Sequence, residues 1–329
     1  SAATVLTLVH EPNACVADIV ESMRRNLDPR RIPVRFVAWR DRLFVVAHHL
    51  FIDAVSWQIL YRDLETIRTS GTVPPATGDL RTYAAALHAA IPAARKQLSY
   101  WRDVVRRGLL ADEGLPNTLT VLDTYGAAAS FTWRLDERQL QKLLSVADAY
   151  HTRIDVILLA GLAAARVDWS ARHYKKHSTS CFVSVESHGR ILPNTDLDLS
   201  EVVGWLTRMY PVLLKLDDAH VVGVHQSDGV EGLVKHVKEQ LRTVPDDGFY
   251  YPLLRHLDPD APLSDNTPLL LFNYLGHIDR PVHHDGSPLS FDLDVMKAGD
   301  EPKMSLTHPI EFNCFTEEDS DGAPTFVVH

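Results

Sequence analysis

Two histidines and a carboxylate stand close together in the hexapeptide His48-His49-Leu50-Phe51-Ile52-Asp53. An imidazole titrates near neutral pH, so it can act as a general acid or base, and a neighbouring carboxylate can fix its tautomer. The same residue types also bind metal ions, but adjacent side chains on a strand point to opposite faces, so only one imidazole can face a site. On its own, the hexapeptide also fits an ordinary strand end with surface histidines, because short motifs often match by chance.

A hairpin and a helix are predicted to position this hexapeptide. Residues 33–47 contain two short runs of β-branched and aromatic residues on either side of a polar turn at 40–42, which predicts a hairpin that ends at the histidines. Asp53 can cap a helix that follows. The apolar residues of this helix recur at helical spacing in one stripe, which consists of Val55, Ile59, Leu60, Leu64 and Ile67.

The rest of the chain alternates irregularly between predicted helices and strands. One or two amphipathic helices are predicted over 81–108, and a polar stretch with Gly and Pro at 109–126 indicates a boundary between two lobes. Further strands are predicted near 131–135, 181–185, 208–216 and 268–275, and further helices near 136–150, 155–171 and 229–243. This pattern predicts an α/β fold with mixed sheets.

Composition narrows the class of protein. The chain has 329 residues, of which 45% are hydrophobic, so it can bury a sizeable core, and a net charge of −10 without a dense Lys/Arg run argues against a nucleic-acid partner. Its three cysteines are widely spaced, which predicts neither a disulfide framework nor a metal-binding pair and suits the cytoplasm. No apolar run reaches 18 residues, so a membrane span is not expected.

Five segments carry a more specific signal, and they occur in a fixed order along the chain. They are His48 to Leu60, Glu186 to Arg190, Val203 to Pro211, Val237 to Gly248 and Phe272 to Gly276. The first resembles the His-His-x-x-x-Asp motif of the condensation superfamily, and the other four resemble motifs of its epimerization branch. The chain therefore resembles an epimerization domain of a nonribosomal peptide synthetase. It resembles a form shortened at both ends, because the family's Pro-x-Gln-x-Trp-Phe segment is not found before the histidines and the family continues with more strand and helix after the segment that matches Ile310 to Phe312.

The resemblance implies a reaction and two catalytic groups. An epimerization domain inverts an α-carbon from L to D while the aminoacyl or peptidyl substrate is held as a thioester. His49 matches the second histidine of the first motif and Glu186 matches the glutamate of the second, so both are implied as catalytic. Inversion removes a proton from one face of the carbon and delivers one to the other face, which two titratable groups can do.

Other motif residues are implied to support the site. His48 and Asp53 match positions that are structural in the family, whereas Tyr210 and Asn273 match positions from which a donor could stabilise the charge on the thioester oxygen. Tyr210 also fits a packing role beside Pro211. The remaining supporting or structural positions are Ser56, His188, Arg190 and Tyr274. Three motif residues are expected in the core, namely Trp57, Leu60 and Trp205.

The resemblance also implies an architecture and a partner. Two lobes, each like chloramphenicol acetyltransferase, would form a V-shaped pseudo-dimer, with an incomplete N-terminal lobe at 1–126 and a C-terminal lobe at 127–329. The substrate would be presented on the phosphopantetheine arm of a carrier domain, beside neighbouring synthetase domains in the cytoplasm. The protein would need no metal or cofactor of its own.

Three alternatives to an active epimerase remain open at this point. A condensation domain would form a peptide bond, but that reaction has no need for Glu186 as a second base. A catalytically degenerate domain would only dock carrier proteins, which changes near the motif residues favour: Ser187 replaces the motif Gly, and Ile191 replaces a common Glu. A stand-alone acyltransferase of the same fold would use His49 alone. Ala54 also replaces a common Gly, which matters only if that position needs a positive φ.

Overall fold

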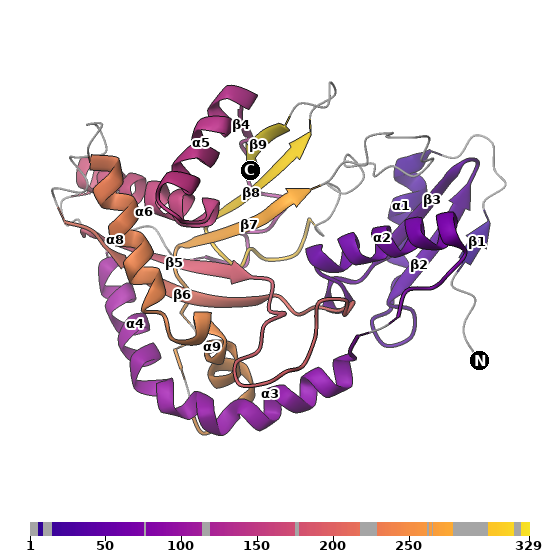
Figure 1. Ribbon diagram of the computed structural model, residues 1–329, viewed down its shortest axis with the longest axis horizontal. Coiled ribbons are helices and arrows are strands. Elements are labelled where there is room, and N and C mark those ends of the chain that lie inside the picture. Colours follow the sequence, from indigo (N-terminus) through magenta and orange to yellow (C-terminus); the bar gives the residue numbers. More distant parts are fainter. Residues whose placement is uncertain are drawn as a thin grey trace. The chain divides into compact units, whose positions relative to one another are not determined.

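The computed structural model of the protein describes residues 6–8, 15–75, 77–113, 119–174, 178–217, 229–261, 263–264, 266–278, 302–318 and 324–329. The helices are α1 (Val16–Arg25), α2 (Ala54–Ser70), α3 (Leu80–Ala94), α4 (Leu98–Ala111), α5 (Glu137–Ala149), α6 (Ile154–His173), α8 (Gly229–Arg242) and α9 (Tyr250–Pro252). The strands are β1 (Leu6–Leu8), β2 (Val34–Trp39), β3 (Arg42–Ala47), β4 (Trp133–Leu135), β5 (Ser180–Ser187), β6 (Arg208–Lys215), β7 (Leu270–Ile278), β8 (Ile310–Glu318) and β9 (Pro324–Val328). The predicted α/β fold with mixed sheets is confirmed (Figure 1).

These elements form two compact units. The first unit contains the chain as far as Tyr83 together with Asp196–Thr207, and the second contains Ala84–Thr195 and the described residues from Arg208 onward. The boundary between them therefore falls inside helix α3, and not near residue 126, where the sequence predicts a lobe boundary. The physical reason is that α4 packs against strands β5 and β6 of the second unit, where its Trp101 is fully buried.

The first unit is built on a small sheet covered by one helix. Strands β2 and β3 form the predicted antiparallel hairpin, in which Val34 pairs with Ala47 and Trp39 with Arg42. Strand β1 pairs with β2 in parallel. The apolar core of helix α1 and the hairpin consists of Ile19, Val20, Met23, Val37, Trp39 and Phe44. Burial of each such side chain contributes about 1.5–3 kcal/mol to the stability of the folded state. This core holds strand β3, and the two histidines follow directly after its last residue, Ala47.

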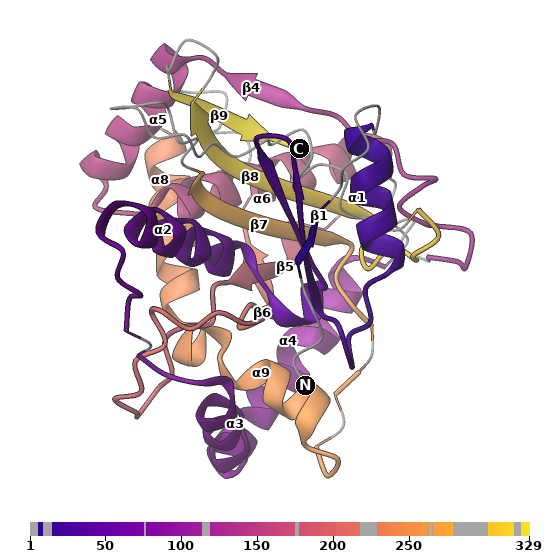
Figure 2. The same cartoon turned by 90° about the vertical axis from the view of Figure 1, so that its right-hand side faces the viewer.

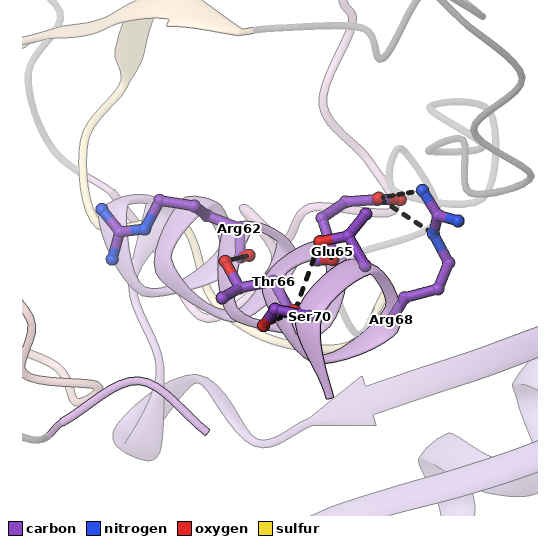
Figure 3. Close-up of polar contacts among 6 residues, drawn as sticks. Arg62, Glu65, Thr66, Arg68 and Ser70 are labelled. Atoms are coloured by element: carbon purple, nitrogen blue, oxygen red, sulfur yellow. Dashed lines mark hydrogen bonds and ion pairs between the residues drawn. The ribbon is translucent and has the colours of Figure 1, made fainter. Parts of the chain in front are cut away.

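Helix α2 begins and ends at well-defined caps. Asp53 is its N-cap, as predicted, and Gly71 ends it with a left-handed φ of 70°. Near that end, the Ser70 hydroxyl donates to the carbonyl oxygen of Thr66, and Arg68 donates to Glu65 (Figure 3). The predicted apolar stripe is only partly correct. Ile59 is buried, but Leu64 and Ile67 are 41% and 39% exposed, because burial is concentrated toward the N-terminal half of the helix.

The second unit is built on a six-stranded mixed sheet with the order β4-β9-β8-β7-β5-β6. Strand β7 runs parallel to both β5 and β8, and the other neighbours are antiparallel. Helix α6 contacts α5, α8 and strand β5 (Figures 1 and 2). None of the described helices is long and apolar enough to cross a membrane.

Close packing under helix α4 fixes β5, the strand that carries Glu186. A side-chain carbon added at Gly108 of α4 would lie 2.2 Å from the ring of Phe182 in β5, so the helix can approach the strand only because residue 108 is a glycine. Phe182 itself is fully buried. This contact fixes the position of strand β5, and the end of that strand carries Glu186.

Candidate active-site residues

The two histidines of the first motif occupy different local structures. His48 follows strand β3, and its Nδ1 accepts a hydrogen bond from the Leu50 N–H at 3.3 Å, so it caps the 3-10 turn η1 (His49–Phe51). His49 is the first residue of that turn and is exposed. The expectation that the pair alternates along a strand is therefore wrong, because the strand ends at Ala47. The turn, and not the pleat of a strand, therefore sets the backbone at His49.

The Asp53 carboxylate holds the start of helix α2. Its side chain is buried, and Oδ1 accepts from the N–H and the hydroxyl of Ser56 at 2.9 and 2.7 Å. Oδ2 accepts from the N–H of Leu206 at 3.1 Å. The carboxylate thus holds the start of α2 through Oδ1 and a loop that lies 153 residues later in the sequence through Oδ2.

Ser56 joins the same two segments. Its hydroxyl oxygen accepts from the N–H of Gly204 at 3.0 Å and lies 2.9 Å from the carbonyl oxygen of Gly204. Ser56 is fully buried, so these bonds are shielded from water. A side-chain carbon at Gly204 would lie 2.5 Å from Leu80, which explains the glycine of the Val-Gly-Trp motif. Two motifs far apart in sequence therefore form one structure within the first unit.

Trp205 lies between the two residues that this network holds, and it is not in the core. Its side chain is 48% exposed, which corrects the expectation of a core residue. Gly204 and Leu206 on either side are buried, whereas the Trp205 side chain between them is exposed. The indole ring lies against the His49 imidazole, with 5.7 Å between the ring centroids and an interplanar angle of 52°.

Glu186 lies near the end of strand β5 in the second unit and is half-buried. It pairs in register with Met209 of β6, and the next residue, Ser187, pairs with Arg208. Ser187 is part of the extended strand, so the motif glycine it replaces is not needed for a positive φ at this place. Ala54 is likewise the first residue of helix α2, where alanine is well suited.

The residues after Glu186 form a tight turn. Gly189 has a φ of 68°, and this left-handed conformation brings the N–H of Arg190 to 3.2 Å from the Nδ1 of His188. The Arg190 guanidinium donates to the carbonyl oxygen of His188 at 3.1 Å. Arg190 is buried and His188 is exposed. The turn therefore holds the segment rigidly next to the carboxylate.

The sheet register separates the other candidate residues into two groups. Residues that pair directly on neighbouring strands share a face, and alternate residues share a face along one strand. Val185 pairs with both Tyr210 and Phe272, so Tyr210 and Tyr274 lie on one face, while Glu186 and Asn273 lie on the other. Asn273 donates from Nδ2 to Asn313 at 3.3 Å. The structure thus groups Asn273 with Glu186, but not Tyr210 or Tyr274.

Tyr210 is held by packing. A side-chain carbon at Gly248 would lie 2.1 Å from its ring, and Gly248 has a φ of 75°, so the glycine of the Pro-x-x-Gly motif provides space for this tyrosine. Its ring also lies 6.4 Å from that of Trp101. Burial, and secondarily the charge of Asp247, raises the pKa of Tyr210 to about 12, so the phenol stays protonated at neutral pH. Its environment is that of a core residue.

A buried histidine that the sequence did not single out lies on the Glu186 face of the sheet. His308 is 1% exposed, and its Nε2 lies 2.9 Å from the hydroxyl of Ser184, two residues before Glu186 on β5. Its Nδ1 lies 3.0 Å from the hydroxyl of Thr307. Burial, with a contribution from Arg255, lowers the pKa of His308 to about 4, so the ring is neutral. No sequence motif marks this residue, and its hydrogen bond to Ser184 reveals it.

A groove of about 680 Å³ lies beside α2 in the first unit. Arg62, Asp63, Thr66, Asp79 and Glu201 are among its lining residues, and Arg62 forms an ion pair with Glu201. None of the candidate site residues predicted from the sequence lines it. Within the described ranges, no cluster of three or more His, Cys, Asp or Glu side chains is arranged to hold a metal ion.

Comparison with known proteins gives one family and one fold. Residues 34–308 match the family model described as "Condensation domain". Among curated proteins, bacitracin synthase 2 of Bacillus licheniformis is 31% identical over 270 residues, which is 79% of this chain and 10% of that protein. Tyrocidine synthase 2 of Brevibacillus parabrevis is 27% identical over 305 residues, or 87% of this chain and 8% of that protein. The chain thus spans a tenth or less of these relatives.

Solved structures show the same fold. The epimerization domain from the third module of tyrocidine synthetase B has a TM-score of 0.72 at 23% identity, over 98% of this chain and 73% of that chain. The first condensation domain of the CDA synthetase has a TM-score of 0.57 at 16% identity, over 98% of this chain and 70% of that chain. The arrangement of helices and mixed sheets described above is therefore that of a condensation domain.

Proposed function

This chain belongs to the condensation-domain family, and on that premise we propose that it inverts the α-carbon of an aminoacyl or peptidyl thioester from L to D. The observation that carries the proposal is the motif Glu186 to Arg190 at the end of β5, with Asn273 on the same face of the sheet. Peptide-bond formation requires no second acid-base group at this place. A half-buried carboxylate next to a rigid turn supports proton transfer instead.

His49 and Glu186 are the proposed acid-base pair. One group removes the α-proton, and the electron pair moves into the thioester carbonyl to give an enolate. The enolate then takes a proton from the other group on the opposite face, so no atom is gained or lost beyond the exchanged hydrogen. An amide N–H of Asn273 is the proposed donor to the enolate oxygen, because it lies on the Glu186 face.

The remaining site residues are proposed to hold these groups. Asp53 and Ser56 fasten the loop next to His49, and His48 caps the turn from which His49 projects. His188 and Arg190 close the turn after Glu186. Tyr210 and Tyr274 are proposed to pack the opposite face of the sheet, since the register directs them away from Glu186.

The substrate is proposed to arrive on the phosphopantetheine arm of a carrier domain of a cytoplasmic nonribosomal peptide synthetase. The similarity to bacitracin synthase 2 and tyrocidine synthase 2 supports this. In this proposal the arm belongs to the partner, and the chain supplies acid-base groups without a metal or cofactor of its own.

Exchange of the α-hydrogen with solvent tests the proposal directly. The purified chain is incubated in D₂O with an aminoacyl or peptidyl carrier thioester, and deuterium at the α-carbon is measured by mass spectrometry together with the D to L ratio. We expect exchange and inversion with the wild type, and loss of both in His49→Ala and Glu186→Ala. The exposed residues His88 and Glu239 provide matched controls, because His88→Ala and Glu239→Ala should retain full exchange.

Two other outcomes would overturn the proposal. A folded wild-type chain without exchange above the carrier alone would indicate a domain that only docks carriers. Amide formation in a parallel assay with a second, acceptor carrier, with exchange absent, would indicate a condensation domain.

A further inference from the structure

Trp205 places a large apolar ring at the surface of the first unit. Its side chain is 48% exposed, although burial of an aromatic residue normally contributes a few kcal/mol to stability. The first question is therefore whether the loop that carries it is fixed.

The loop is fixed on both sides of the ring. The N–H of Gly204 donates to the Ser56 hydroxyl at 3.0 Å, and the N–H of Leu206 donates to the Asp53 carboxylate at 3.1 Å. Both acceptors are buried, and hydrogen bonds to buried groups are strong relative to their exposed counterparts. The backbone of residue 205 therefore has little freedom.

His49, by contrast, has no other side-chain partner in the part of the chain that the structure describes. Its imidazole makes no hydrogen bond to another described residue, and its one ring contact is Trp205, at a centroid separation of 5.7 Å. Both neighbours that could have fixed it are used elsewhere: Asp53 bonds Ser56 and Leu206, and His48 bonds Leu50. Without Trp205, an exposed imidazole would rotate between several orientations.

We propose that Trp205 is a positioning residue for His49, and that its indole ring holds the imidazole in the orientation from which it transfers a proton. The ring forms a wall on one side of the imidazole and leaves both ring nitrogens available to the substrate. The buried pair Asp53 and Ser56 acts through the loop, so the two motifs, 148 residues apart, cooperate in placing one side chain. The catalytic part of this inference rests on the proposed function.

The expected signature is a loss of turnover without a loss of binding. Misplacement of a catalytic group by about 1 Å can lower a rate about 100-fold, whereas substrate affinity depends on other contacts. In the exchange assay, Trp205→Leu should lower kcat by about 10- to 100-fold with KM nearly unchanged. Trp205→Phe keeps a ring at the same place and should recover most of that loss. Trp133→Leu removes an exposed tryptophan of the second unit and should have no effect.

A measurement that is independent of activity separates this inference from the proposed function. Ring-proton resonances of His49 are identified in the ¹³C-histidine-labelled chain by their absence in His49→Gln. In the wild type the Trp205 ring current should displace them from the values of an exposed histidine. Trp205→Leu should return them to those values, Trp205→Phe should keep part of the displacement, and Trp133→Leu should leave them unchanged.

The outcomes are distinct. Undisplaced His49 resonances in the wild type, or equal kcat in Trp205→Leu and wild type, would overturn the positioning role. Displaced resonances in a chain that shows no exchange would support the contact and overturn only the epimerase proposal.

Discussion

His49 and His308 are the same residue type in opposite circumstances. His49 is exposed at a turn, and among the described residues neither of its ring nitrogens has a hydrogen-bond partner. His308 is 1% exposed, and both of its ring nitrogens face hydroxyl groups, those of Ser184 and Thr307. A buried polar group must be satisfied to be tolerated, which leaves it nothing to offer a substrate. The comparison shows that an imidazole is available for proton transfer when no other group of the protein occupies its ring nitrogens.

The largest expected effect is that substitution of His49 lowers activity and not stability, whereas substitution of His308 lowers stability and not activity. His49→Gln should lower α-hydrogen exchange by about 10²- to 10⁴-fold, the usual contribution of an acid-base group. It should change the free energy of unfolding by less than about 0.5 kcal/mol, since the residue is exposed. His308→Gln should do the reverse, with lower stability and a nearly unchanged rate in the folded fraction. Urea unfolding and the exchange assay measure the two quantities on the same samples.

That comparison breaks down if the two variants behave alike. Equal destabilisation in both would mean that His49 has structural contacts. A His308→Gln chain that is fully stable but inactive would move the catalytic assignment to the second unit.

Acid should expose the next largest effect, which concerns His308. Its pKa is about 4 in the folded chain against an ordinary value of 6.5, because burial disfavours the charged ring. The unfolded chain then binds the extra proton first, so stability is intact above pH 6.5 and declines as the pH falls toward 4. The full loss is on the order of 3 kcal/mol.

The free energy of unfolding, measured by urea titration at several pH values, checks this prediction. His308→Gln should remove this part of the pH dependence, while His49→Gln should retain it. A wild-type curve that runs parallel to that of His308→Gln between pH 6.5 and 4 would contradict it.

A smaller effect is expected at the helix cap that fastens the loop beside His49. Asp53→Ala removes the N-cap of α2 and the bond to Leu206, and should destabilise the chain by about 1–2 kcal/mol. It should also lower exchange, because the loop that carries Trp205 loses an anchor. Asp136→Ala is the matched control: it removes the N-cap of α5 and should give a similar loss of stability.

Exchange by the folded chain distinguishes the two cap variants. It should be normal in Asp136→Ala and reduced in Asp53→Ala. If both variants retain full exchange, the loop does not need Asp53 to place Trp205.

The smallest effect is expected at Ser184. Ser184→Ala removes the hydroxyl next to Nε2 of His308 and should destabilise the chain by about 0.5–1.5 kcal/mol. Ser184→Thr keeps a hydroxyl and serves as the conservative control. The double variant with His308→Gln tests whether the pair acts as a unit: its destabilisation should be smaller than the sum of the two single variants.

Local patterns in the sequence predicted much of the fold. The hairpin before the histidines, the cap at Asp53 and the strand before Glu186 each depend on residues near one another in the chain, and all three are present. The compact units were not predictable in this way. Their boundary inside α3 depends on the packing of α4 against distant strands, which leaves no local signal in the polar stretch after it.

The site was predictable only as far as motifs could carry it. Trp205 resembles a core residue by type, and its exposure follows from bonds to Asp53 and Ser56 that no local pattern encodes. The alternation rule failed at His49 because the strand ends two residues earlier. The separation of Tyr210 from Glu186 required the register of β5 and β6. His308 lies outside the motifs, so it was missed altogether.

The bonds between the start of α2 and the loop at 204–206 also bear on how the chain is made. A nascent chain leaves the ribosome N-terminus first, so Asp53 and Ser56 emerge long before their partners. Leu206 lies 153 positions after Asp53, and Gly204 lies 148 positions after Ser56. Until then the first unit lacks one of its segments, and closure of so long a loop carries an entropic penalty that only the finished structure offsets. A chain stalled on the ribosome shortly after α4 would therefore contain the β2–β3 hairpin and helix α2, but the Asp53 carboxylate would still lack its hydrogen bond from Leu206.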